Sequence, residues 1–216
     1  MPVPVVLAAL GAVPAAAVAT AWYVKRGFAR KLAKTRVAIL GNRRVGKSAL
    51  LDALQKPSHD RALPATAAPL GGSFEMEISG KVVRFEVPRD LPGNQRLALQ
   101  AWKEAFEEAG NIWYLFRADR VVQGDLDEIS IIRKHIALLA GWMQQGHKPK
   151  VVLVGTWAEQ DDEWASNREQ FIERVSRADP INVALVKLNF ASLVVGSLGT
   201  PKDAIALVRD LRKQYR

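Results

Sequence analysis

The chain has 216 residues, of which 49% are hydrophobic, which excludes wholesale disorder and predicts one folded domain with room for a short extension. It has no Cys, which excludes disulfides, thiolate metal sites and a Cys nucleophile, and its three widely spaced His argue against a His-built zinc site. The net charge of +9 belongs to the first 51 residues, which contain nine basic and no acidic side chains. The rest of the chain has 22 of each, so no nucleic acid partner is predicted.

An apolar segment opens the chain. Residues 3–24 carry no charged side chain, and as a helix they would span about 33 Å, enough to cross a hydrocarbon layer of about 30 Å. Trp22 and Tyr23 end the segment, and Lys25 and Arg26 follow, which predicts that the remaining chain faces the cytoplasm. We therefore expect residues 1–34 to form a transmembrane anchor with a basic juxtamembrane segment. An Ala-rich composition without Cys favours a bacterial inner membrane. A cleaved signal peptide, a buried helix and a disordered leader are the alternative interpretations.

Short apolar runs alternate with segments of helical period after residue 35. Strands are predicted at residues 36–40, 112–116, 151–155 and 183–188. Helices are predicted at residues 48–54, 95–109, 125–143, 162–178 and 202–215, and a loop at 59–72. Residues 74–78 and 81–87 alternate in polarity around Ser79 and Gly80, which indicates a β-hairpin. This order predicts an α/β fold over residues 35–216: a mostly parallel six-stranded sheet with one antiparallel edge strand and helices on both faces.

One motif carries a specific chemistry. The sequence GNRRVGKS matches the phosphate-loop pattern G-x-x-x-x-G-K-[ST], between a predicted strand and a predicted helix. The glycines let successive backbone N–H groups turn towards phosphate oxygens, and the N-terminus of the helix adds its dipole. Lys47 would reach the β- and γ-phosphates, and the Ser48 hydroxyl would bind Mg²⁺. The candidate nucleotide-binding residues here are Gly41, Asn42, Arg43, Arg44, Val45, Gly46, Lys47, Ser48 and Ala49. A glycine turn followed by a chance Lys-Ser pair is the alternative.

The stretch RVAILGNRRVGKSALLDAL resembles the start of Ras-like and related translation-factor-class GTPases. The resemblance covers roughly residues 35–216. It implies a P-loop NTPase fold, GTP or GDP as the ligand, Mg²⁺ as the cofactor and an effector or regulator protein that reads the nucleotide state. An anchor followed by a GTPase domain is similar to the layout of the β subunit of the signal recognition particle receptor.

The resemblance also implies switch residues. These GTPases place a Thr about 20 residues after the loop Lys, and a D-x-x-G motif after the third strand. Thr66 follows Lys47 by 19 residues, and Asp90 and Gly93 begin and end the sequence DLPG. Thr66 and Asp90 are therefore candidate Mg²⁺ contacts, and the N–H of Gly93 is a candidate contact of the γ-phosphate.

The catalytic residues that the resemblance implies are Lys47, Thr66 and a water-positioning Gln. Asn94 occupies the usual place of that Gln, directly after the Gly of D-x-x-G, and Gln95 comes one residue later. Arg43 occupies a position that is small in Ras, where it would crowd the γ-phosphate, supply a positive charge to it, or face solvent. The rate of intrinsic hydrolysis is therefore left open.

Guanine specificity in this family comes from an N/T-K-x-D motif after the fifth strand. The corresponding segment here offers Thr156, then Trp157 in place of Lys, and Glu159 at the Asp position, with Asp161 and Asp162 as further carboxylates. The Glu159 carboxylate would accept hydrogen bonds from guanine, and Trp157 would stack on the base. The alternative is that Trp157 and Trp164 pack in the core and the acids cap the next helix.

A Ser-Ala loop after the sixth strand reads guanine O6 in the family, and Ala191 falls at the Ala position of that loop, after the strand predicted at 183–188. The preceding Phe190 replaces the Ser. The leading functional hypothesis is a membrane-anchored GTPase switch. A nucleotide-binding scaffold with little hydrolysis and an ATP-using P-loop protein are the alternatives.

Overall fold

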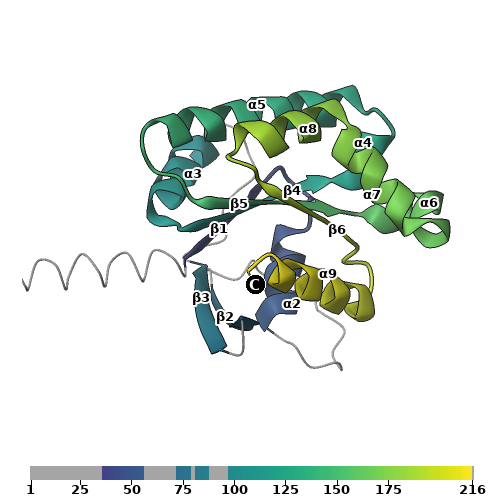
Figure 1. The fold of residues 1–216 in the computed structure, drawn as a ribbon, viewed down its shortest axis with the longest axis horizontal. Coiled ribbons are helices and arrows are strands. Elements are labelled where there is room, and N and C mark those ends of the chain that lie inside the picture. The colour runs from purple at the N-terminus through teal and green to yellow at the C-terminus, as the bar shows by residue number, and fades with distance from the viewer. Residues whose placement is uncertain (1–35, 56–71, 79–80, 88–96, 216) are drawn as a thin grey trace, which may run out of the picture.

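The structure, a computed structural model, describes residues 36–55, 72–78, 81–87 and 97–215. Four parallel strands form its main sheet in the order β1-β4-β5-β6 (Figure 1). These strands are β1 (Val37–Gly41), β4 (Asn111–Arg117), β5 (Lys150–Thr156) and β6 (Ser192–Val195). Two further strands, β2 (Gly72–Ile78) and β3 (Lys81–Val87), pair antiparallel in a sheet of their own, which confirms the predicted hairpin pairing.

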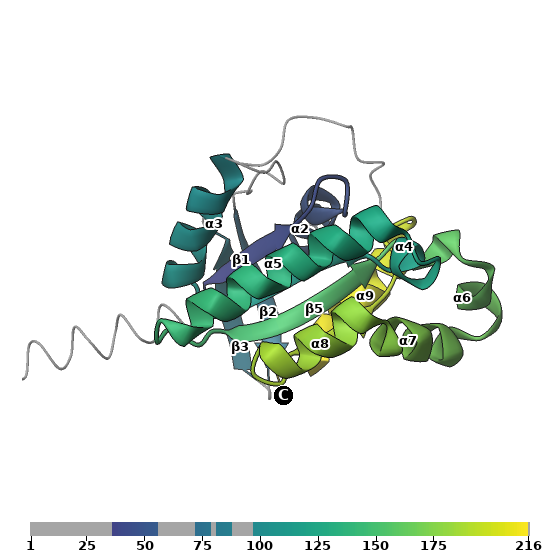
Figure 2. The same ribbon diagram turned by 90° about the horizontal axis from the view of Figure 1, so that it is seen from above.

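Helices cover both faces of the main sheet (Figures 1 and 2). The core on one face is completed by α3 (Leu97–Glu108), α4 (Ala118–Val122), α5 (Leu126–Gln144), α7 (Arg168–Arg177) and α8 (Asp179–Lys187). The core on the other face is completed by α2 (Lys47–Gln55), α9 (Pro201–Lys213) and the β2–β3 pair. A short 3₁₀ turn, η1 (Ala158–Gln160), and helix α6 (Asp162–Ser166) follow β5.

Alternation along the strands divides the apolar residues between these two cores. In β4, Tyr114 and Phe116 face the α5 side, whereas Trp113 and Leu115 face α2 and α9. All four side chains are at most 1% exposed. Successive strand residues point to opposite faces, and a sheet covered on both faces therefore needs a continuous apolar run in its central strands. The strands predicted from continuous apolar runs at 36–40, 112–116 and 151–155 meet this requirement, and they are confirmed as β1, β4 and β5.

The expectation of one six-stranded sheet is wrong. Within the described residues, the only backbone pairing that involves the β2–β3 pair and the edge of the main sheet is one isolated bridge, between Arg36 and Glu86. In this pair Phe74 and Phe85 are buried and stacked, with ring centroids 5.3 Å apart, whereas Arg84 and Glu86 are exposed. A ribbon with one charged face must leave that face in water, so it cannot lie between two helical layers as β4 does.

The strand predicted at residues 183–188 is also wrong, because this segment belongs to α8. Pro180 lies in the first turn of the helix, where a missing N–H costs nothing. Ile181, Ala184 and Leu188 are buried at helical spacing, and this period outweighs the β propensity of the valines between them. The last strand is β6, which lies further along the chain.

The helices predicted at 48–54, 95–109, 125–143 and 202–215 are confirmed as α2, α3, α5 and α9. The single helix predicted at 162–178 is instead two helices, α6 and α7, separated by Asn167. Asn167 has φ −147° and ψ 79°, and its side chain accepts a hydrogen bond from the N–H of Gln170, 3.2 Å away. Asn is a preferred N-cap, so it begins a new helix rather than continuing the old one.

The transmembrane helix expected before the domain is not found: in the part of the chain that the structure describes, no helix is both long and apolar enough to cross a membrane. Residues 3–24, on which that expectation rests, lie outside the described residues. The loop expected at residues 59–72 also lies outside them, apart from Gly72, which begins β2.

One polar pair lies in the core between the sheet and α5. The Nδ1 atom of His135 is 3.0 Å from the hydroxyl of Tyr114, and the His135 and Trp102 ring centroids are 4.8 Å apart. Burial, reinforced by the positive charges of Lys47 and Lys134, lowers the pKa of His135 to about 4. The imidazole is therefore neutral at pH 7, which is the form that a buried site tolerates.

We expect His135 to make the stability of the protein depend on pH in mildly acid solution. Its folded pKa of about 4 is below its unfolded pKa of about 6.5, so between these values the unfolded state binds the proton more strongly. The free energy of unfolding should fall by about 3 kcal/mol as the pH decreases from about 6.5 to about 4. Urea unfolding at several pH values measures this loss, and His135→Gln, which cannot titrate, should reduce it. An equal loss in both proteins would contradict the prediction.

Candidate functional site

The segment with the phosphate-loop pattern, loop 41–48, leaves β1 at the carboxyl end of the parallel sheet and enters α2. Its backbone has positive φ at three residues: Gly41 (146°), Arg44 (60°) and Gly46 (87°). Glycine adopts such conformations freely, whereas they are uncommon for other residues. A Cβ atom on Gly41 would lie 2.4 Å from the carbonyl oxygen of Leu115. The loop can therefore turn away from the sheet at this point only because Gly41 has no side chain.

Lys47 connects the end of this loop to its beginning. Its Nζ atom donates to the carbonyl oxygens of Gly41, at 3.1 Å, and Asn42, at 2.8 Å. These bonds hold the ammonium group across the loop, where it adds positive charge next to the N-terminus of α2. Ser48 and Ala49 lie in the exposed first turn of that helix. The loop folds back over an exposed helix N-terminus, and such an arrangement can bind an anion.

Val45 and the two arginines of loop 41–48 differ in exposure. Val45 is 1% exposed and packs in the core with α2. Arg43 and Arg44 are both exposed, in agreement with the interpretation that these side chains face solvent. Gly46 approaches the segment that follows β6, since a Cβ there would lie 2.9 Å from Cδ1 of Leu198.

Thr156, at the end of β5, joins the sheet to this loop. The residue is completely buried, and its Oγ1 lies 2.8 Å from the carbonyl oxygen of Val45 and 3.0 Å from that of Phe116. A hydroxyl has one proton to donate, so these two carbonyls share it. The predicted base-reading segment therefore begins with a contact to the predicted phosphate-binding loop.

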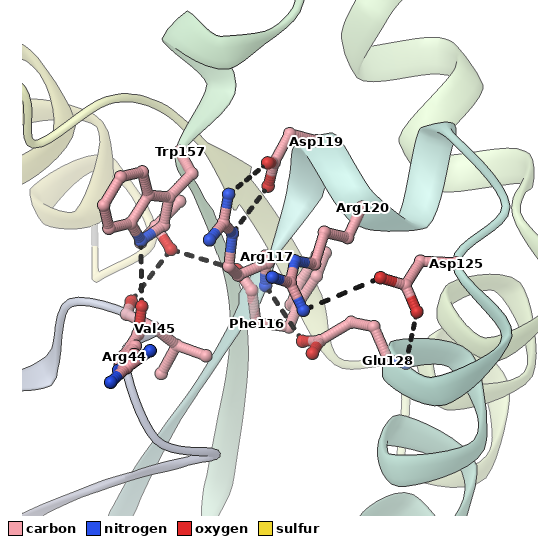
Figure 3. A network of polar contacts seen from close by, with 10 residues as sticks. Arg44, Val45, Phe116, Arg117, Asp119, Arg120, Asp125, Glu128 and Trp157 are labelled. Atoms are coloured by element: carbon pink, nitrogen blue, oxygen red, sulfur yellow. Dashed lines mark hydrogen bonds and ion pairs between the residues drawn. The ribbon is translucent and has the colours of Figure 1, made fainter.

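Trp157 makes a second connection to the same loop. Its Nε1–H donates to the carbonyl oxygen of Arg44, with the two atoms 3.1 Å apart (Figure 3). The backbone of Trp157 is left-handed, with φ 61° and ψ 27°, a conformation that costs about 1 kcal/mol or more in a residue of this size. The guanidinium carbon of Arg117 lies 4.4 Å from the centroid of the indole. The ring is half-buried, so it does not belong to the interior of the core.

Glu159 is exposed in the η1 turn and lies beside the segment that follows β6. A Cβ on Gly199 would be 3.2 Å from Oε1 of Glu159. Asp161 has a different role, because its Oδ1 accepts from the N–H of Glu163 at 3.0 Å and caps α6. Asp162 is exposed in the first turn of that helix. The capping interpretation is thus confirmed for Asp161, and Glu159 is the carboxylate that faces the neighbouring segment.

The position expected for Ala191 is wrong, because β6 begins after this residue rather than before it. Ala191 therefore lies at the amino end of the parallel sheet, opposite to loop 41–48. The segment after β6 is Gly196–Thr200, which the sequence reasoning missed. Its Leu198 lies close to Gly46, its Gly199 lies beside Glu159, and the carbonyl of Gly196 accepts from the N–H of Ala158 at 3.4 Å. The signal available in the sequence was the short apolar run SLVV followed by Gly and Ser.

Four candidate residues, Thr66, Asp90, Gly93 and Gln95, lie outside the described residues. Within the described ranges, no group of three or more His, Asp or Glu side chains is placed to hold a metal ion. The described part of the expected site therefore consists of loop 41–48, the segment from Thr156 to Glu159 and the segment from Gly196 to Thr200. All three lie at the carboxyl end of the parallel strands, where ligands of open α/β sheets bind.

A network of charged side chains borders this region (Figure 3). Arg117 donates from Nε and Nη2 to the two carboxylate oxygens of Asp119, and its backbone N–H donates to Oε1 of Glu128 at 3.3 Å. Nη1 of Arg120 is 3.6 Å from Oδ2 of Asp125, the N-cap residue of α5. Burial raises the pKa of Glu128, while the bond from Arg117 opposes that shift. This network fixes the end of β4 next to Trp157.

Gly41→Ala should destabilise the protein by more than about 1 kcal/mol, because the new methyl group would overlap the Leu115 carbonyl and the backbone φ is unfavourable for Ala. Gly141 in α5 is the matched control, since a Cβ there meets nothing within 4 Å. Gly141→Ala should stabilise the helix by about 0.5–1 kcal/mol. Chemical unfolding of both variants measures the difference. Equal stabilities would show that the turn at Gly41 does not need glycine.

Comparison with protein-family models gave no match for this chain, and comparison with curated proteins gave none either. The functional proposal therefore rests on the residues and the geometry described above.

Proposed function

We propose that this protein binds guanine nucleotides with Mg²⁺ and hydrolyses GTP slowly, as a switch that a partner protein reads. The observation that carries the proposal is the joining of three segments at one end of the sheet. Loop 41–48 has the turns and the lysine of a phosphate site, and Thr156 and Trp157 bind the carbonyls of that loop directly. The segment from residue 196 to residue 200 lies close to both Gly46 and Glu159. A bound nucleotide spans its phosphate site and its base site, so the segments that form the two sites must lie next to each other.

The phosphates would lie against the N-terminus of α2. Backbone N–H groups of the loop and of the first helical turn would donate to phosphate oxygens, and the helix dipole would add favourable charge. Lys47, held by the carbonyls of Gly41 and Asn42, would place its ammonium group beside the β- and γ-phosphates. Positive charge held in advance stabilises the charge that develops during phosphoryl transfer.

Ser48 fits a role as a Mg²⁺ ligand. Its hydroxyl is a hard oxygen donor in the exposed first turn of α2, and Mg²⁺ commonly takes one or two protein ligands together with phosphate oxygens. Thr66 and Asp90 are the further ligands that the sequence predicts. When bound, Mg²⁺ would neutralise charge on the β- and γ-phosphates.

The guanine edge would lie between Glu159 and the segment after β6. Guanine offers two adjacent donors, N1–H and the N2 amine, to a carboxylate, and it offers the O6 acceptor to a backbone N–H. Glu159 lies beside Gly199, which supports this arrangement because a carboxylate and a peptide backbone are side by side there. Adenine does not offer the same pair of donors, so the carboxylate would favour guanine.

Lys47→Ala should weaken GTP binding at least tenfold, because the variant loses the charged donor of the loop. Lys187→Ala, which removes an exposed lysine from the last turn of α8, is the control and should bind GTP normally. Equilibrium binding with Mg²⁺, competition between GTP and ATP, and release of phosphate from GTP are the measurements.

The proposal fails if the wild-type protein binds no nucleotide, and the guanine assignment fails if ATP competes as well as GTP. Mg²⁺-dependent binding without measurable phosphate release would favour the nucleotide-binding scaffold.

Glu159→Gln should weaken GTP binding at least tenfold, because an amide cannot accept two charge-assisted hydrogen bonds from guanine. Binding of inorganic tripolyphosphate, which has no base, should be unchanged. The exposed Glu169 of α7 provides the matched control, Glu169→Gln, which should leave both ligands unaffected. Competition binding measures all three proteins, and an unchanged GTP affinity in Glu159→Gln would remove Glu159 from the base site.

A further inference from the structure

We infer that Arg117 is a positioning residue that holds the Trp157 indole as the stacking surface for a purine base. The inference rests on the proposed function, since it assigns a role within the same nucleotide site. It starts from the contact of the Arg117 guanidinium with the face of the indole, 4.4 Å from the ring centroid (Figure 3).

The backbone brings these two side chains together. Arg117 is the last residue of β4, and in the parallel register it pairs with Thr156, the residue directly before Trp157. The carboxyl ends of two neighbouring strands therefore deliver the guanidinium and the indole to the same place. The left-handed backbone of Trp157 turns its side chain out of the strand direction, towards loop 41–48.

Asp119 fixes the orientation of the Arg117 guanidinium. Nε and Nη2 of Arg117 donate to both oxygens of Asp119, whose side chain is 4% exposed, while the side chain of Arg117 is 19% exposed. A two-bond contact to a buried carboxylate fixes the plane of the guanidinium as well as its position. The plane that contacts the indole is therefore set by the interior of the protein and not by solvent.

The indole is fixed at a second point as well. Its Nε1–H donates to the carbonyl oxygen of Arg44, so the ring is held by Arg117 on one face and by the loop at its edge. An aromatic ring held in this way loses little conformational freedom when a base stacks on it, and such preorganisation increases affinity. The residue is half-buried, so part of it is exposed to solvent, and the base would stack on the exposed part of the ring.

This arrangement connects the base to the phosphates. The atom that anchors the indole is the backbone carbonyl of Arg44, which stands beside Val45, the residue whose carbonyl faces Thr156. A shift of the ring would therefore remove the stacking surface for the base, while the bonds from Lys47 to the carbonyls of Gly41 and Asn42, which do not involve the ring, keep the phosphate site in place. Arg117 would influence nucleotide affinity without touching the nucleotide itself.

The test compares GTP with inorganic tripolyphosphate on the full-length protein with Mg²⁺. Arg117→Gln loses the cation, and Arg117→Lys loses the planar group that two bonds to Asp119 hold against the ring. Each variant should weaken GTP about tenfold and leave tripolyphosphate unchanged. Arg117→Lys keeps a cation beside the buried Asp119, so it remains informative where Arg117→Gln fails to fold. The matched control is Arg133→Gln, because Arg133 also donates from Nε and Nη2 to an aspartate, Asp179, on the exposed surface.

A double-mutant cycle separates positioning from a direct effect. Trp157→Ala alone should weaken GTP, and adding Arg117→Lys to it should change the affinity less than twofold, because the arginine acts through the ring. The inference is overturned if the wild-type protein binds GTP but the Arg117 variants bind it normally, weaken both ligands equally, or keep their full effect in the Trp157→Ala background. If the wild-type protein binds neither ligand, the proposed function itself fails.

Discussion

The candidate site depends on one close approach, that of Gly41 to the carbonyl oxygen of Leu115. At this point β1 leaves the sheet beside β4 with no room for a side chain, and the chain folds back over the start of α2. The bonds from Lys47 to Gly41 and Asn42 require that fold, since they connect the two ends of the loop. The carbonyls of Arg44 and Val45 reach Trp157 and Thr156 only because the loop is turned in this way.

The parallel sheet supplies the rest of the site by bringing strand ends together. β4 ends in Arg117 and β5 ends in Thr156, and these two residues are partners in the register. Two successive residues, Thr156 and Trp157, then bind two successive carbonyls of the loop. Rigid strands therefore set the positions of groups that lie on loops, which is a common way to build a precise site on irregular backbone.

Much of this arrangement could be predicted from the sequence, and the failures have physical causes. Continuous apolar runs identified β1, β4 and β5, and the spacing of glycines and Lys47 identified the loop. The segment at 183–188 was assigned wrongly because valines suggested a strand, while burial of Ile181 and Ala184 follows a helical period. That error displaced the next strand and made Ala191 a candidate in place of Gly196–Thr200. The prediction of a six-stranded sheet is wrong because alternating polarity along a strand shows that its two faces differ. It does not show which sheet the strand joins.

The Arg117–Trp157 contact could not be predicted in the same way, because it depends on register. The sequence separates the two residues by 40 positions, and only the parallel pairing of β4 with β5 places them side by side. The partner that orients the guanidinium, Asp119, is two residues away and in a different element, α4. The motif predicts a role for Trp157 alone, whereas in the structure the guanidinium of Arg117 lies against its ring.

The loop contacts its neighbours through main-chain atoms, and this has a consequence for its two arginines. The carbonyl of Arg44 binds Trp157, while the side chains of Arg43 and Arg44 extend into solvent. The charges of these two side chains therefore do not contribute to the bonds that hold the loop in its conformation. Charge at such positions acts mainly on diffusion, because it attracts anions towards the site before any contact forms. The rate at which a phosphate ligand arrives should then decrease with ionic strength, while the shape of the loop stays the same.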